Sequence, residues 1–135
     1  MKTSITTNKN GNVVYKGNIK IDGDLTVDTN LVVEGDLIVA GNLTVYKDIS
    51  VTGNVISQNL DCEGIICKNL TVYGGIIAAK IECAKLDATS VRASTIRSKI
   101  CSIRDVKCVT LVTEQLHLKE SGEIEVLSWL YVKPA

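Results

Sequence analysis

Apolar residues recur along the chain at a regular six-residue interval from Val13 to Val55, and then mostly at a five-residue interval from Leu60 to Leu116. The second residue after each of them is nearly always apolar or small as well. This alternation is the period-two signature of a short β-strand with one buried face. A long amphipathic α-helix is excluded, because it needs apolar positions three and four residues apart. The pattern therefore predicts an all-β fold, a single-stranded parallel β-helix or solenoid.

Turn residues stand between the predicted strands of the first half. Glycine followed by Asn or Asp precedes six of these strands, at Gly11-Asn12, Gly17-Asn18, Gly23-Asp24, Gly35-Asp36, Gly41-Asn42 and Gly53-Asn54. Glycine adopts positive φ freely, and Asn or Asp tolerates left-handed backbone while hydrogen-bonding the local chain. Three sides make a coil of about 18 residues, and strands of successive coils pair about 4.8 Å apart. We expect about six coils and a rod about 30 Å long.

From Leu60 onward the repeat shortens, and the second inward position changes from Val to Cys, Ala, Ser or Thr. Shorter sides enclose less volume, and a close-packed interior has no room for larger side chains there. Two structures fit this change. The rod either tapers, with coils of about 15 residues, or switches to four-sided coils of about 20 residues.

The repeat divides the chain into three parts. Residues 1–12 are predicted to form a flexible or capping N-terminal arm, residues 13–118 the β-helix, and residues 119–135 a C-terminal strand, cap or assembly segment. Both ends of a β-helix expose unpaired strand backbone, which must be capped or joined to another chain.

The predicted end-to-end interface has one group of residues at each end of the rod. The groups are Val13, Val14 and Tyr15 at the first end, and Ile124, Val126, Trp129, Leu130 and Tyr131 at the second. Trp129 and Tyr131 have two interpretations, a cap over the last coil or a contact with another subunit, since aromatic residues are enriched in contact cores. Residues 1–20 carry a net charge of +4 and residues 108–135 a net charge of −2, which favours head-to-tail stacking.

Composition narrows the function. The 135 residues are 45% hydrophobic, which suits one folded domain, and 15 basic residues balance 15 acidic ones, so nothing attracts the whole chain to nucleic acid. The chain has no long apolar run and no apolar core of a secretory signal near Met1, so we expect a cytoplasmic protein. Residues 68–107 hold eight basic and three acidic residues. We interpret this basic belt as a solvated surface, with weak membrane or nucleic-acid contact as the alternative.

Two resemblances add to this reading. Residues 11–57 resemble the bactofilins. The resemblance is carried in particular by the stretch Gly35-Asp-Leu-Ile-Val-Ala-Gly-Asn-Leu-Thr-Val45. That resemblance implies a cytoskeletal β-helix that polymerises with itself without nucleotide, by joining like ends. The segments Ala79-Lys-Ile81 and Ala84-Lys-Leu86 are similar to pentapeptide-repeat proteins, with a small residue two positions before a central aliphatic one. Lys99 and Arg104 stand where that family has small residues, and the chain contains no Phe, so it departs from the pentapeptide pattern.

The residues that often carry chemistry fit structural positions. Five cysteines fall on inward positions of the repeat and are predicted to be buried core residues: Cys62, Cys67, Cys83, Cys101 and Cys108. Three-sided coils would stack Cys67 on Cys83, but the odd number of cysteines and a cytoplasmic setting favour free thiols. No Cys-x-x-Cys pair accompanies the single His117, which lies at an outward position, so we predict no metal, cofactor or catalytic site.

We therefore expect a non-enzymatic structural protein that assembles end to end into a filament or cytoskeletal scaffold, with itself as partner and no small-molecule substrate. One alternative is a capped adhesion or fibre module of a phage-like or virus-like appendage. A second is a carbohydrate-binding protein or enzyme on a β-helix, which needs loops that carry carboxylates or aromatic residues.

Overall fold

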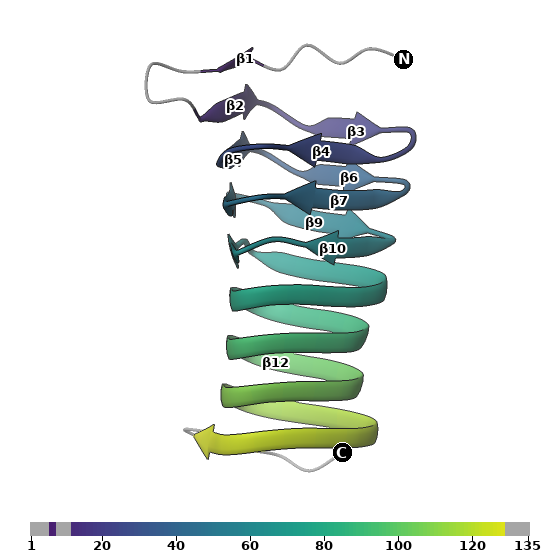
Figure 1. Ribbon diagram of the computed structural model, residues 1–135, viewed down its shortest axis with the longest axis vertical. Coiled ribbons are helices and arrows are strands. Elements are labelled where there is room, and N and C mark those ends of the chain that lie inside the picture. Colours follow the sequence, from purple (N-terminus) through teal and green to yellow (C-terminus); the bar gives the residue numbers. More distant parts are fainter. Residues whose placement is uncertain (1–5, 8–11, 129–135) are drawn as a thin grey trace.

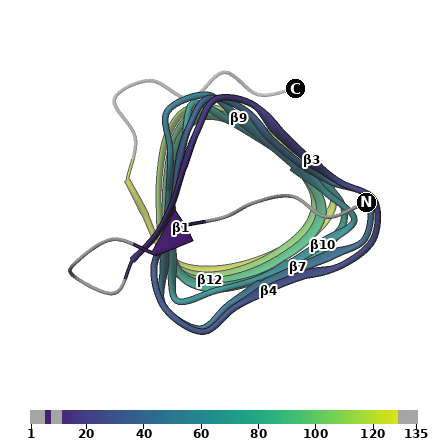
Figure 2. The ribbon, with the colours of Figure 1, turned by 90° about the horizontal axis from the view of Figure 1, so that it is seen from above.

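The fold is a rod of stacked coils. The computed structural model describes the backbone of residues 6–7 and 12–128, and the burial of residues 12–115 and 117. These parts form twelve β-strands and no helix. The chain winds downward in successive turns (Figure 1), and along the rod axis it has a three-sided outline (Figure 2). The predicted all-β parallel β-helix is confirmed.

The strands of the first half are short. They are β1 (Thr6–Thr7), β2 (Val13–Lys16), β3 (Ile19–Ile21), β4 (Leu25–Val27), β5 (Leu31–Glu34), β6 (Leu37–Val39), β7 (Asn42–Val45), β8 (Asp48–Val51), β9 (Asn54–Ser57), β10 (Asn59–Asp61) and β11 (Gly64–Ile66), followed by β12 (Asn69–Ser128). Except for β1, which pairs with β2 in antiparallel fashion, all these pairings are parallel.

Each side of the coil is a stack of parallel strands. Side A contains β2, β5, β8 and β11, side B contains β3, β6 and β9, and side C contains β4, β7 and β10. The strand β12 continues all three stacks. The separately assigned strands make about four turns, and β12 adds further turns below them (Figure 1). The number of coils therefore differs slightly from the expected six.

The coils become shorter along the chain. Val13 pairs with Leu31, and Leu31 with Ile49, so the first coils contain 18 residues. Farther on, the interval is 15 between Val55 and Leu70 and 16 between Ile65 and Ile81. Later coils lie inside the outline of the first ones (Figure 2). The rod therefore tapers and keeps three sides, which decides between the two structures that the sequence left open.

The second half of the rod has no short strands, because β12 runs without interruption for 60 residues. Five corners of the first half contain glycine, each between two short strands: Gly17, Gly23, Gly35, Gly41 and Gly53. Past Gly75 no glycine occurs before Gly122, and the backbone bends at the corners while it stays extended.

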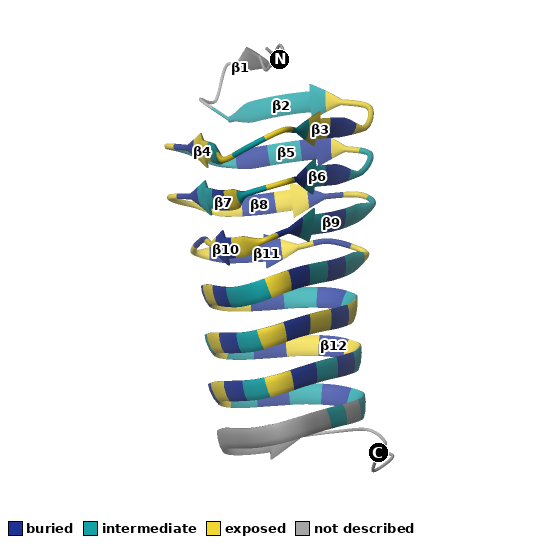
Figure 3. Ribbon diagram, turned by 90° about the vertical axis from the view of Figure 1, so that its right-hand side faces the viewer, coloured by how far each residue is buried: buried dark blue, intermediate teal, exposed yellow. Residues whose placement is uncertain are grey.

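Aliphatic side chains fill the interior. On side C, Leu43, Leu60 and Ile76 stack on one another and are at most 2% exposed. Burial alternates with exposure along most strands (Figure 3), as the period of two predicts. Such stacks supply most of the hydrophobic stabilisation, at about 25 cal/mol per Å² of apolar surface removed from water.

Asn and Asp side chains connect the corners of neighbouring coils. The Oδ1 atom of Asn18 accepts a hydrogen bond from the backbone N–H of Asp36 at 2.8 Å, and Oδ1 of Asp36 accepts one from the N–H of Asn54 at 2.8 Å. Asp24 receives the N–H of Asn42 in the same way at 2.8 Å. These ladders satisfy backbone donors at corners, where the strand ladder is interrupted.

One polar group in the core has no partner. Ser57 is fully buried on side B beside Val72, and its Oγ makes no hydrogen bond within the described part of the chain. An unsatisfied buried hydroxyl costs about 1–3 kcal/mol. We therefore expect Ser57→Ala to raise the free energy of unfolding by about 1 kcal/mol, measured by urea denaturation with far-UV circular dichroism.

Ser98 provides the matched control for this prediction. It is also buried on the inward side, but its Oγ donates a hydrogen bond to the Ile100 carbonyl at 3.0 Å. Ser98→Ala should lower the free energy of unfolding by about 1 kcal/mol. If both substitutions destabilise the rod equally, Ser57 is hydrogen-bonded in solution and the prediction is wrong.

Candidate assembly surfaces

The first coil presents two strand edges at the N-terminal end of the rod. Among the described strands, β3 pairs only with β6, and β4 pairs only with β7. In β3, the N–H of Ile19 donates to Asp36 and the carbonyl of Ile21 accepts from Ala40, both at 2.9 Å and both in the second coil. Because backbone groups alternate in direction along a strand, the N–H and C=O of Lys20 face the open end of the rod. The edge of β3 thus offers a donor and an acceptor to an incoming strand.

The same alternation holds for β4. The carbonyl of Val27 accepts a hydrogen bond from the N–H of Tyr46 at 2.9 Å, toward the second coil. The backbone groups of Thr26, one residue earlier, therefore face the open end. Lys20 and Thr26 are both exposed.

The third edge of this end is occupied. Thr6 of β1 pairs with Val14, and Thr7 with Val13, in antiparallel register. The predicted N-terminal arm of residues 1–12 therefore includes a two-residue strand on side A. The pairing shows that this end of the rod accepts an antiparallel strand.

The structure separates the residues predicted for the end-to-end interface. Val13 and Tyr15 are half-buried and pack against the core, whereas Val14 lies between them on the opposite face of β2. Val14 is therefore directed outward, and the end-to-end interface at these three residues stays a prediction.

The second predicted group belongs to the other end of the rod. Ile124 and Val126 lie in the last part of β12, far from β2 (Figure 1). Trp129, Leu130 and Tyr131 are outside the described residues, so the choice between cap and interface stays a prediction.

The net charge of the first coil differs from the net charge of residues 1–20. The first coil runs over residues 13–30, because Val13 pairs with Leu31. It contains two lysines, Lys16 and Lys20, and three aspartates, Asp22, Asp24 and Asp28, for a net charge of −1. The net charge of +4 over residues 1–20 does not describe this coil, so the electrostatic reason for head-to-tail stacking is weaker than the sequence indicated.

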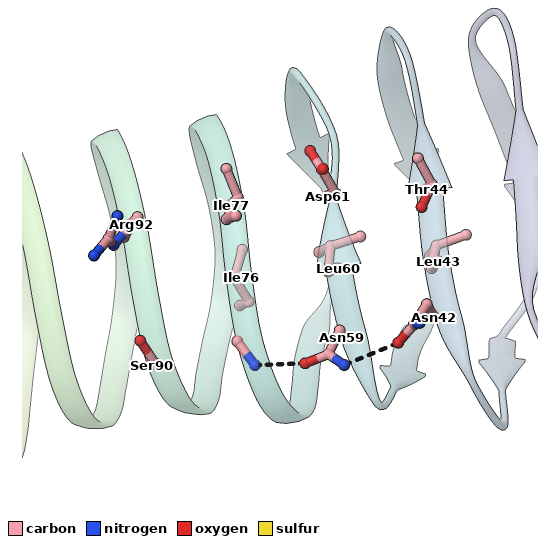
Figure 4. A pocket seen from close by; sticks show the side chains of 11 residues that line it. Asn42, Leu43, Thr44, Asn59, Leu60, Asp61, Ile76, Ile77, Ser90 and Arg92 are labelled. Carbon is pink, nitrogen blue, oxygen red and sulfur yellow. Dashed lines mark hydrogen bonds between the residues drawn. The ribbon is translucent and has the colours of Figure 1, made fainter.

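A second surface lies on the outside of side C. Thr44 pairs with Asp61, and Asp61 pairs with Ile77, so these outward side chains form a row along the rod. Arg92 continues the row on the next coil (Figure 4). Beside it lies a hollow of about 410 Å³, whose lining includes these four residues and the small residues Gly75 and Ser90.

The cysteines are core residues. All five are free and buried, as predicted. Burial raises the pKa of Cys62 and of Cys101 to about 12, so both thiols stay protonated at neutral pH. Cys67 and Cys83 lie on adjacent coils, as three-sided geometry requires, and a hydrogen bond between them raises the pKa of Cys67 strongly.

The remaining candidates are dispersed. The basic belt of residues 68–107 is spread around the rod, with Arg92 on side C and Arg97 beside Glu82 on side A. His117 is half-buried. Within the described residues, no group of three His, Cys, Asp or Glu side chains is placed to hold a metal ion. The described part also contains no helix long and apolar enough to cross a membrane.

Comparison of the chain with protein-family models, with curated proteins and with solved structures gave no match.

Proposed function

We propose that this chain is a structural repeat protein whose copies join end to end, without nucleotide, into a filament or scaffold. The observation that carries the proposal is the pair of strand edges at β3 and β4, which no described strand covers. An exposed strand edge is a template for pairing with another chain, and main-chain hydrogen bonds then supply affinity. The resemblance of residues 35–45 to bactofilins supports the same role.

The taper favours joining like ends. The first coil contains 18 residues, whereas the inward residues Cys83, Ser98 and Thr113 follow at intervals of 15. A head-to-tail junction would place a wide coil on a narrow one, so strands and corners would not align on all three sides. Two first coils match in size when a two-fold axis relates them, and their strands then pair antiparallel, as β1 and β2 do.

Joining by like ends gives a filament in which N-terminal and C-terminal junctions alternate. The strand β1 must leave the edge of β2 at an N-terminal junction, because it occupies the row that the partner coil needs. It contributes only two paired residues, so its displacement breaks few hydrogen bonds.

Proline at the two open edges tests the proposal. Proline removes a backbone N–H and is tolerated on edge strands where that N–H faces solvent. The double variant Lys20→Pro and Thr26→Pro should keep the circular dichroism spectrum of the rod but form no filaments in negative-stain electron microscopy. The matched variant Lys20→Ala and Thr26→Ala keeps both N–H groups and should assemble like the parent chain.

The parent chain itself provides the decisive result. Filaments of uniform narrow width with an axial repeat of two copies are expected at low and at physiological salt. Discrete particles at every salt and protein concentration would reject end-to-end assembly, and a repeat of one copy would reject the like-end arrangement.

The pairing of β1 with β2 favours a second candidate, a capped module of an appendage. There β1 would protect one edge permanently. Discrete particles in the same experiment would support this candidate.

A further inference from the structure

We infer that side C is a lateral contact surface for a second, antiparallel copy of this chain, centred on Ile77. The inference goes beyond end-to-end joining, because it concerns the flank of the rod. It rests on the order of the outward residues along side C.

The row on side C is self-complementary. Asp61 lies on the coil before Ile77, to its right in Figure 4, and Arg92 lies on the coil after it, to its left. Consider a two-fold axis that lies between the two copies and runs parallel to the strand of Ile77. This axis reverses the order of the row in the partner. Ile77 then faces the partner's Ile77, and Asp61 faces the partner's Arg92 on each flank of the axis. Such an isologous contact closes by itself into a pair.

Charge selects the direction of the partner. In a parallel arrangement each Asp61 would face another Asp61, and each Arg92 another Arg92, which places like charges together. The antiparallel arrangement replaces both repulsions with two ion pairs, and complementarity of this kind fixes the register of a contact. Within the described part of the chain neither side chain makes a salt bridge, so both are available to a partner.

The shape of side C suits the same partner. Ile77 is 58% exposed, so it offers apolar surface that a partner can cover. Gly75 and Ser90 carry no bulky side chain, and they border the hollow beside Ile77. Beside the two facing isoleucines, this hollow lets the opposing copy approach closely.

The contact is small, since the row from Thr44 to Arg92 extends over about 14 Å at the usual strand spacing. A single pair of copies is therefore expected to associate weakly. In a filament the same contact repeats along the rod, and repeated weak contacts gain avidity.

Cysteine cross-linking tests the inference without requiring filaments. In Ile77→Cys the two new thiols face each other across the axis, while the five native cysteines are buried. Under oxidised glutathione, which takes up the two electrons and becomes reduced glutathione, this variant should form covalent dimers. Ile66→Cys is the matched control, because Ile66 is 56% exposed in the preceding strand but lies on side A. We expect at least five-fold more dimer from Ile77→Cys.

Charge exchange provides the second arm of the test. Adding Asp61→Arg to Ile77→Cys should reduce the dimer several-fold, and adding Arg92→Asp to that variant should restore it. Equal dimer from both cysteine variants, or a yield that does not respond to these charges, would overturn the lateral contact. Repeating the assay in the Lys20→Pro and Thr26→Pro background separates it from end-to-end joining, because the cross-link is expected to persist there.

Discussion

Alanine at position 35 is expected to destabilise the rod more than alanine at position 23. Both glycines occupy corners with positive φ, 152° at Gly35 and 136° at Gly23. Alanine at either position must adopt a strained backbone conformation, which costs about 1–3 kcal/mol. At Gly35 the Cβ would also collide with the Gly17 carbonyl oxygen and lie 2.8 Å from Oδ1 of Asn18, on the coil above. This collision is expected to add about 1–3 kcal/mol.

Gly23 is the control that isolates the collision. A Cβ there meets no atom within 4 Å, so Gly23→Ala reports backbone strain alone. Urea denaturation of the two variants, followed by circular dichroism, measures the difference. Equal free energies of unfolding would show that the first two coils adjust their spacing at this corner without cost.

The sequence predicted the sides of the rod well because burial on each side depends only on local alternation. Leu31 and Val33, for example, are both buried while Val32 between them is not, and the same order returns at most repeats. Position along the chain was therefore enough to assign the inward residues, including all five cysteines.

Features that depend on contact between coils could not be predicted in the same way. The bond from the N–H of Asn42 to Asp24 joins residues 18 positions apart, and the sequence identified these residues only as turn formers. The choice between a tapering rod and four-sided coils depends on the angle at corners that lack glycine, which no residue pattern specifies.

The candidate surfaces could not be predicted from the sequence either, and the reason is physical. Thr44, Asp61 and Ile77 follow at intervals of 17 and 16 residues, because the coil shortens in this region. A constant repeat length does not align these three residues. The row on side C is therefore identified only from the pairing register of the strands. The two threonines of β1 lack the apolar alternation that identifies the other strands, and their pairing with β2 was missed as well.

The two proposed contacts use different parts of the repeat. End-to-end joining depends on main-chain groups at Lys20 and Thr26, whereas lateral contact depends on the side chains of Asp61, Ile77 and Arg92. Substitutions in one set leave the other intact. A filament whose successive copies alternate in direction also presents both directions of side C, so a neighbouring filament can supply antiparallel partners.

Leu43→Ala is expected to cause one of the largest losses of stability in the rod. The Leu43 side chain is fully buried, and its strand lies between those of Leu25 and Leu60 on side C. Truncation removes buried methyl groups and leaves a cavity that the ladders on both sides keep from collapsing, at a cost of about 2–5 kcal/mol. Thr44→Ala is the control. The side chain of Thr44, the residue after Leu43, points outward, so its truncation should change the free energy of unfolding by less than about 0.5 kcal/mol. In a solenoid each coil stabilises its neighbours, so the urea transition of Leu43→Ala should also broaden. A loss as small as that of Thr44→Ala would mean that the aliphatic stack does not hold the coils together.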